Sequence, residues 1–184
     1  MNKNKTHMMI LSGLFAALIA VGAFIKIPVP YMDYFTLQFF FVILAGTLLG
    51  SKLGNISVLT YIFIGLAGVP IFAAGGGLGY IVRPSFGFLI GFVFAALIAG
   101  KVCEKFKENN IKTYLIAAFA GLVVTYWVGF IYKYLMMKYY VGEPVPFAII
   151  FASAFPLDIP GDIILCIIAA IVSKKLEIVK GRYI

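Results

Sequence analysis

Four charged side chains stand in or beside apolar segments of this sequence: Arg83, Lys133, Asp158 and Asp162. A guanidinium can hold a carboxylate through two parallel hydrogen bonds, whereas an aspartate can accept hydrogen bonds from N–H groups. A charged side chain near the centre of a bilayer costs about 2.5 to 3.5 kcal/mol on insertion scales, so such residues are kept where they meet a partner or a cavity. The four residues therefore predict a binding site for a small acidic ligand that also carries N–H donors.

Each of these residues also has a simpler interpretation. Arg83 could extend to lipid headgroups instead of binding a ligand. Lys133 interrupts an apolar segment near its external end, where it would either reach headgroups or close a pocket. Asp158 and Asp162 could neutralise one of the two basic residues across a helix bundle without contacting a ligand.

The two aspartates lie four residues apart in the segment FPLDIPGDIILC. This spacing places both on one side of a helix. However, Pro160 and Gly161 stand between them, and a proline in the interior of a helix breaks or kinks it. We therefore expect a helix that is broken between Asp158 and Asp162.

The segment from 73 to 83, AAGGGLGYIVR, is rich in glycine and is tested first as a phosphate-binding loop. A dinucleotide fingerprint needs glycine at its first, third and sixth positions, but the sixth position is Tyr80 counted from Gly75 and Val82 counted from Gly77. No Gly-Lys-Ser/Thr sequence follows. The chain is thus predicted to have no nucleotide site of its own, and the glycines predict a flexible loop over a pocket with Tyr80 in its wall.

Aromatic side chains accompany these polar residues and would suit a flat, apolar ligand body. Aromatic residues at helical spacing also pack cores, so we expect most of this set to be core. The set comprises Tyr80, Phe86, Phe88, Tyr126, Trp127, Phe130 and Tyr132.

The composition requires a membrane to position these residues. Of 184 residues, 63% are hydrophobic and only 12% are charged, and the mean hydropathy is +1.06. Apolar segments near the roughly 20 residues that cross a bilayer recur along the sequence, which leaves no room for a soluble domain. The two cysteines and single histidine show no metal-ligand spacing, and no nucleophile and base pair is evident, so we expect no metal, no cofactor and no catalytic residue.

These segments predict an all-α integral membrane protein that forms one domain over residues 1–184. We expect six transmembrane helices, at about 8–25, 36–50, 55–72, 84–101, 112–135 and 155–173. Eleven of the 15 basic residues then lie on the side of the termini, which predicts a multi-pass protein of a bacterial-type plasma membrane with both termini cytoplasmic. The same rule explains the net charge of +8 without nucleic acid.

The external connections 26–35, 73–83 and 136–154 are apolar, aromatic and rich in proline and glycine. Irregular backbone at membrane depth is tolerated where protein buries it, so we expect these loops to cap one ligand pocket, although they could be simple interfacial loops. Small residues recur at a spacing of four, as at Ala16 and Ala20. Such a face suits either a partner helix or packing within the bundle.

Taken in order, several segments resemble the BioY family, the biotin-specific substrate-binding components of energy-coupling factor transporters. The resemblance covers nearly the whole chain and rests on AALIAVGAFIKIPVP at 16–30, FTLQ at 35–38, LAGTLLGSKLG at 44–54, GLAGVPIFAAGGGLGY at 65–80, PSFGFLIGF at 84–92 and PGD at 160–162.

The resemblance implies a six-helix, non-enzymatic subunit that captures biotin from outside and releases it inward. Its implied partners are one transmembrane coupling subunit and two ATPase subunits, and Ala16 and Ala20 would face the coupling subunit. Within the matching segments, Phe35, Gln38 and Gly77 are assigned to the ligand site beside the residues named above, including Tyr126.

One departure concerns the carboxylate of the ligand. The family often has a lysine three residues after the aspartate of the last helix, whereas Leu165 stands here. Arg83 would replace that cation, or the ligand would be a biotin precursor or another ring acid with a short tail. A self-sufficient proton-coupled transporter of a small organic acid is a further alternative, motivated by the two aspartates.

Overall fold

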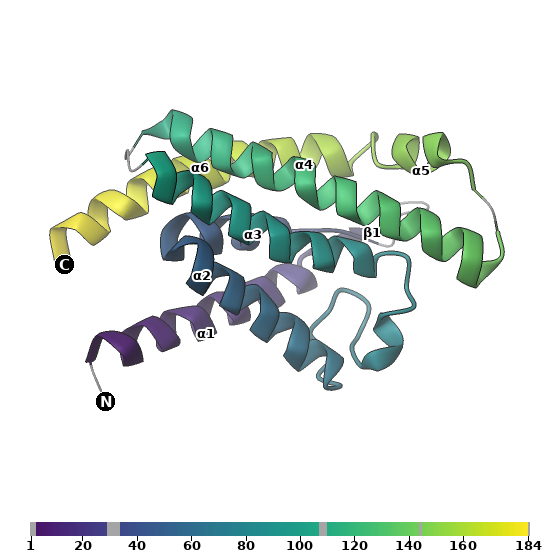
Figure 1. The fold of residues 1–184 in the computed structure, drawn as a ribbon, viewed down its shortest axis with the longest axis horizontal. Coiled ribbons are helices and arrows are strands. Elements are labelled where there is room, and N and C mark those ends of the chain that lie inside the picture. Colours follow the sequence, from purple (N-terminus) through teal and green to yellow (C-terminus); the bar gives the residue numbers. More distant parts are fainter. Residues whose placement is uncertain (1–2, 29–33, 107–109, 144, 184) are drawn as a thin grey trace.

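The computed structural model describes residues 3–28, 34–106, 110–143 and 145–183, which form a helical bundle with one small β-hairpin (Figure 1). The elements in chain order are α1 (Lys3–Phe24), β1 (Lys26–Pro28), β2 (Tyr34–Thr36), α2 (Gln38–Leu66), a 3₁₀ turn η1 (Leu78–Tyr80), α3 (Phe86–Phe106), α4 (Ile111–Met136), a π-helical turn η2 (Met137–Val141), α5 (Phe147–Ser153) and α6 (Asp158–Tyr183).

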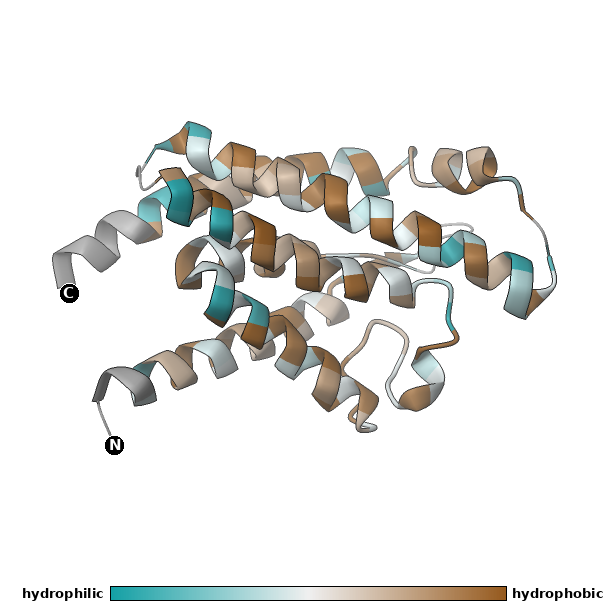
Figure 2. Cartoon of the chain, viewed as in Figure 1, coloured by the Kyte–Doolittle hydropathy of each residue, from teal (hydrophilic) through white to brown (hydrophobic). Residues whose placement is uncertain are grey.

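The described helices suit a membrane. Four of them are long and apolar enough to cross one, and a fifth span is obtained if α5 and α6, bent by 53° at their junction, are taken as one. Figure 2 shows apolar residues along the helices and hydrophilic residues gathered near their ends. The bundle is therefore that of a multi-pass membrane protein, and the count of six spans stays a prediction.

Helix α2 is continuous in its hydrogen-bonding pattern from Gln38 to Leu66, but a kink divides it into two helical arms. Gly50 interrupts it with φ 82° and ψ 176°, a conformation that residues other than glycine rarely adopt. A Cβ on Gly54 would lie 2.6 Å from the carbonyl oxygen of Ala45, whereas nine residues of straight helix span roughly 13 Å. The chain therefore reverses at Gly50, where the sequence separates its second and third predicted spans.

A carboxylate from the neighbouring helix caps this reversal. Glu104 of α3 accepts hydrogen bonds from the backbone N–H of Ser51 at 2.7 Å and from its hydroxyl at 3.0 Å. The first amides of a helix lack intrahelical partners, so an acidic side chain satisfies and stabilises them. Glu104 thus fixes the start of the second arm.

Small residues bring the helices of the bundle together. A Cβ on Gly91 of α3 would lie 2.8 Å from the carbonyl oxygen of Thr125 in α4, so the two backbones are in contact there. On α1, Ala16 is only 6% exposed and belongs to the core, and Ala20 is half-buried against it. These two alanines pack against the bundle in the described residues, and their contact with a partner stays a prediction.

Several features of these elements differ from the expected ones. The span predicted to end at residue 72 ends at Leu66, because Gly68 adopts φ 108° and terminates the helix. The span predicted to start at Pro84 starts at Phe86, after a turn. The connections 26–35 and 136–154 were expected to be irregular, but contain the antiparallel β1–β2 pair and α5, respectively.

Candidate ligand-binding site

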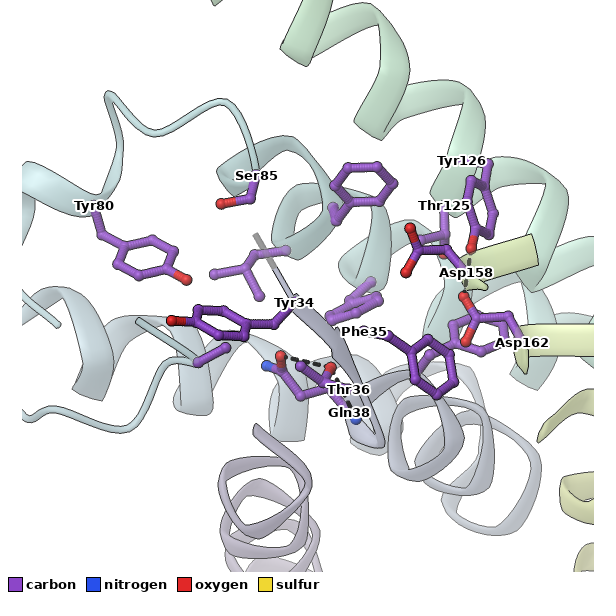
Figure 3. Close-up of a pocket in the computed structure, with 15 residues that line it drawn as sticks. Tyr34, Phe35, Thr36, Gln38, Tyr80, Ser85, Thr125, Tyr126, Asp158 and Asp162 are labelled. Atoms are coloured by element: carbon purple, nitrogen blue, oxygen red, sulfur yellow. Dashed lines mark hydrogen bonds between the residues drawn. The ribbon is translucent and has the colours of Figure 1, made fainter. Parts of the chain in front are cut away.

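One cavity among the described residues is walled by segments from most of the chain. Strand β2, the start of α2, helices α3 and α4, the connection between α2 and α3 and the start of α6 all contribute to it (Figure 3). Its lining comprises Tyr34, Phe35, Thr36, Gln38, Phe39, Ala73, Tyr80, Ser85, Phe88, Leu89, Phe92, Thr125, Tyr126, Asp158 and Asp162. Most of these side chains are aromatic or aliphatic, with a few polar groups among them, as is typical of small-molecule sites.

One end of the cavity is acidic. Asp158 and Asp162 are 6% and 8% exposed, and the hydroxyl of Tyr126 donates a hydrogen bond to Asp162 Oδ2 at 2.7 Å (Figure 3). Asp158 Oδ2 and Asp162 Oδ1 are buried and accept no hydrogen bond from the described residues. Buried polar atoms are nearly always paired, so two unpaired carboxylate oxygens beside a cavity indicate acceptors for a ligand's donors.

The fold places both carboxylates on the first turns of one continuous helix. α6 begins at Asp158, and the N–H of Gly161 donates to the carbonyl of Leu157 at 2.8 Å. The expected break between the aspartates is therefore wrong. Pro160 falls in the first turn, where its missing N–H would have no intrahelical partner, and proline is tolerated there.

Lys133 lies behind this acidic end. It is 7% exposed on α4 and close enough to interact electrostatically with Asp158, but it does not line the cavity. The side chain therefore does not extend to the headgroup region as an exposed lysine would. It contributes positive charge to the wall that carries the two aspartates.

The other end of the cavity carries hydroxyl groups. Figure 3 shows Tyr34, Tyr80 and Ser85 grouped away from Asp158 and Asp162. Tyr34 belongs to β2, Tyr80 closes the 3₁₀ turn η1, and Ser85 immediately precedes α3. The cavity is thus elongated, with acceptor groups at one end and hydroxyls at the other.

A chain of hydrogen bonds runs along one wall. Thr36 Oγ1 donates to Gln38 Oε1 at 3.0 Å, and Gln38 Nε2 donates to the hydroxyl of Tyr61 at 2.6 Å. Tyr61 is fully buried and its hydroxyl donates to the carbonyl of Ile71 at 3.2 Å. Gln38 is thereby held in place, and its orientation in the cavity is set by the second arm of α2.

The cavity brings together six of the side chains that the sequence assigned to a ligand. These are Phe35, Gln38, Tyr80, Tyr126, Asp158 and Asp162.

Three other assigned residues do not line it. The Arg83 guanidinium lies 5.5 Å from the centre of the Tyr80 ring, so the arginine packs against a lining residue. Gly77 adopts φ 93° and donates its N–H to the carbonyl of Gly65 at 2.7 Å, which anchors the glycine-rich loop to α2. Lys133 lies behind Asp158, as described above.

Several residues at the cavity were not predicted from the sequence. Tyr34 stands two residues before Thr36 on β2, and side chains two residues apart in a strand lie on the same face of it. A sequence-based prediction of the hairpin would therefore have placed Tyr34 and Thr36 on one face. Thr125 is 1% exposed and donates to the carbonyl of Gly121 at 2.9 Å, a common helical contact without a sequence signal. Gly161 does not line the cavity itself but lies under the lining Phe35 ring, where a Cβ would be 2.6 Å from Phe35 Cζ, and this contact joins distant parts of the chain.

The fold and the cavity define a class: a multi-pass helical membrane protein with an internal site for one small ligand. The BioY family model matches residues 1–181, and the chain belongs to the BioY family.

Relatives of known family match this chain over nearly its whole length. The chain is 39% identical to a probable biotin transporter BioY of Lysinibacillus sphaericus, over 96% of this chain and 89% of that protein. It is 37% identical to a biotin transporter BioY of Thermotoga maritima, over 92% of this chain and 97% of the relative.

A solved structure shares the fold. The S-component for biotin from an ECF-type ABC transporter superimposes with a TM-score of 0.83 at 25% identity, covering 96% of this chain and 94% of the other. The arrangement of helices around the cavity is therefore that of a transporter's substrate-binding component.

Proposed function

We propose that this chain is the biotin-binding subunit of an ATP-driven vitamin uptake transporter of the ECF type, and not an enzyme. It would capture biotin from the external side and release it inward together with a transmembrane coupling subunit and two ATPase subunits. The observation that carries the proposal is the pair of buried carboxylate oxygens of Asp158 and Asp162, which have no hydrogen-bond partner among the described residues, at one end of an aromatic cavity.

Biotin has chemistry that matches this cavity from end to end. Its ureido group carries two N–H donors, which would pair with Asp158 Oδ2 and Asp162 Oδ1. Its fused ring would lie against Phe35 and the aromatic residues of α3, since aromatic faces suit a flat apolar body. The valerate tail would then extend to the hydroxyl end, toward Tyr80 and Ser85.

In this proposal two residues outside the lining contribute charge. Arg83 would reach the carboxylate of the tail, because it stands against Tyr80 at the hydroxyl end and a guanidinium binds carboxylates in a bidentate manner. Lys133 would balance the charge of Asp158 from behind the acidic end. Gly77 would act at a distance from the ligand, by anchoring the loop to the carbonyl of Gly65.

The proposed topology is a single domain over residues 1–184, with six spans and both termini cytoplasmic. The reversal at Gly50 supports six spans, because it makes two antiparallel arms of α2. Both chain ends lie on one side of the bundle in Figure 1, together with the facing ends of α3 and α4, where basic residues such as Lys101 and Lys112 stand. Basic residues favour the cytoplasmic side.

The proposed contact with the coupling subunit through Ala16 and Ala20 needs a rearrangement of α1, since both side chains face the bundle. Crosslinking from α1 in a co-expressed complex tests it. A cysteine at exposed Gly13 that crosslinks to the coupling subunit while one at Ala16 does not would assign the contact to the other face of α1.

The function itself is tested by the ligand that the protein retains. Protein purified in detergent is denatured, and the released small molecules are identified by mass spectrometry, with titration of added biotin as a second measurement. Retention of biotin, or tight binding of it, is expected. An empty pocket with no measurable affinity for biotin would refute the proposal.

A second ligand of the same class is favoured by one observation. Leu165 is buried at 9% exposure and leaves no basic side chain three residues after Asp162. A biotin precursor or another ring acid with a short tail would need less positive charge there. Competition between biotin and such a precursor for the purified protein decides between them.

A further inference from the structure

Two segments that cover the cavity come from distant parts of the chain. The hairpin, formed by β1 and β2, contributes Tyr34, Phe35 and Thr36 to the lining. The glycine loop, residues 67–77, contributes Ala73. How these two segments are held together therefore decides whether this side of the cavity is open or closed.

The glycine loop is the fixed member of the pair. Its Phe72 is 1% exposed and packs edge-on against Tyr61 of α2 at 5.4 Å between ring centres. Backbone hydrogen bonds between Phe72 and Gly75, at 2.8 and 3.1 Å, close a tight turn with Ala73 inside it, and the N–H of Gly77 binds the end of α2. The carbonyl of Ala73 is thus presented at a fixed position.

Among the described residues, a lysine side chain joins the hairpin to that carbonyl. Lys26 of β1 donates from Nζ to the carbonyl of Ala73 at 2.5 Å, and the same ammonium lies 4.6 Å from the centre of the Tyr34 ring. Lys26 pairs with Thr36 across the hairpin, so it stands opposite the strand that lines the cavity. Its side chain is exposed, in contrast to the buried contacts that hold the loop.

We propose that Lys26 is a positioning residue that latches the hairpin over the cavity and sets the rates at which the ligand enters and leaves. This inference rests on the proposed function for the identity of the ligand, but the latch itself is a property of the hairpin and the loop. An exposed charge-assisted hydrogen bond is strong enough to keep a cover closed and weak enough to break on the timescale of lid motions.

A latch has a kinetic signature that a direct ligand contact lacks. If the ligand passes only when the cover is open, both the association and the dissociation rate are proportional to the open fraction. Loosening the latch raises both rates by the same factor and leaves Kd unchanged. A residue that binds the ligand directly changes Kd instead.

The experiment compares Lys26→Met with the unsubstituted chain in detergent, using stopped-flow association of biotin and dissociation into excess unlabelled biotin. We expect both rates to rise about tenfold, which corresponds to about 1.4 kcal/mol, with Kd changed less than twofold. Lys26→Arg should restore the original rates, because a guanidinium also donates to a carbonyl. Lys52→Met, at an exposed lysine beside the break in α2, is the matched control and should leave both rates unchanged.

Biotin amide separates the latch from an ion pair with the ligand. The latch predicts the same rise in rates for biotin and for its neutral amide. A Kd that rises for biotin only would show that Lys26 binds the carboxylate, and unchanged rates for both would show that the contact with Ala73 does not hold the cover; either result overturns the proposal.

Hydrogen exchange of the protein alone provides a readout that needs no ligand. Lys26→Met should speed exchange of the hairpin amides of Ile27 and Phe35, and Lys26→Arg should not. If biotin does not bind the unsubstituted chain, the proposed function is wrong. The hydrogen-exchange rates then still test whether Lys26 holds the hairpin. Equal exchange in the unsubstituted chain and the methionine variant would refute it.

Discussion

Replacing Asp162 by asparagine removes one negative charge from the acidic end while preserving the size of the side chain. In the structure the hydroxyl of Tyr126 donates to Asp162 Oδ2 at 2.7 Å, and Oδ1 is the oxygen left for a ligand N–H. An asparagine places an oxygen at one of these two positions and an NH₂ group at the other, so only one of the two donors finds an acceptor where it stands.

The magnitude follows from this shortage of acceptors. If Tyr126 keeps the oxygen, the NH₂ group meets the ligand's N–H, and donor opposes donor. If the ligand takes the oxygen, the buried hydroxyl of Tyr126 loses its acceptor. A lost hydrogen bond to a charged group costs about 1.5 to 3 kcal/mol, so we expect biotin to bind about 10 to 150 times more weakly.

A double-mutant cycle tests the reasoning beyond the size of the effect. Tyr126→Phe removes the competing donor, and the asparagine of the double variant can then turn its oxygen to the ligand. We expect Asp162→Asn to cost less affinity in the Tyr126→Phe background than in the unsubstituted chain. Equilibrium binding of biotin to the four proteins provides the numbers, and Glu143→Gln, at an exposed position, is the matched charge control.

Two results would refute this account of the acidic end. An Asp162→Asn variant that binds biotin as tightly as the unsubstituted chain would show that Oδ1 is not a ligand acceptor. Strictly additive losses in the double variant would show that Tyr126 and the ligand do not compete for the oxygens of Asp162.

Three further predictions concern other residues. Arg83→Ala should weaken binding of biotin more than binding of biotin amide, because a guanidinium contributes mainly through the carboxylate; equal losses would remove Arg83 from that role. Gly50→Ala should destabilise the protein by about 1 to 3 kcal/mol in thermal melts, since φ 82° and ψ 176° favour glycine. Gly13→Ala is the control, because a Cβ at Gly13 would meet open space. Equal melting temperatures of the two variants would contradict the chain reversal at Gly50. Gly161→Ala should displace the Phe35 ring and weaken biotin binding several-fold without lowering the melting temperature by as much as Gly50→Ala, and an unchanged Kd would show that this contact does not shape the cavity.

Much of the site was predictable because its signals are local or compositional. Charges in apolar segments are costly, so Asp158 and Asp162 could be singled out without a structure, and the cavity indeed lies beside both. The order of segments that resembles the BioY family added Phe35 and Gln38, which also line the cavity. The family model and the relatives confirm that resemblance.

Other parts of the site depend on contacts that a sequence does not display. Pro160 predicts a broken helix, but its effect depends on whether it falls in the interior or in the first turn, and the start of α6 at Asp158 decides this. Arg83 is as conspicuous in the sequence as the aspartates, yet it packs against Tyr80 and does not line the cavity.

By itself the sequence determined that this is a helical membrane protein with a ligand site and that it resembles one transport family, because hydropathy, charge and segment order are properties of the chain. Tertiary structure alone decided which groups face the cavity and which stand behind them. It paired Tyr126 with Asp162, laid Phe35 over Gly161 and joined Lys26 to Ala73, 47 residues apart. The physical reason is that such contacts depend on how helices approach one another, and close packing between distant segments fixes that approach only when the whole bundle is assembled.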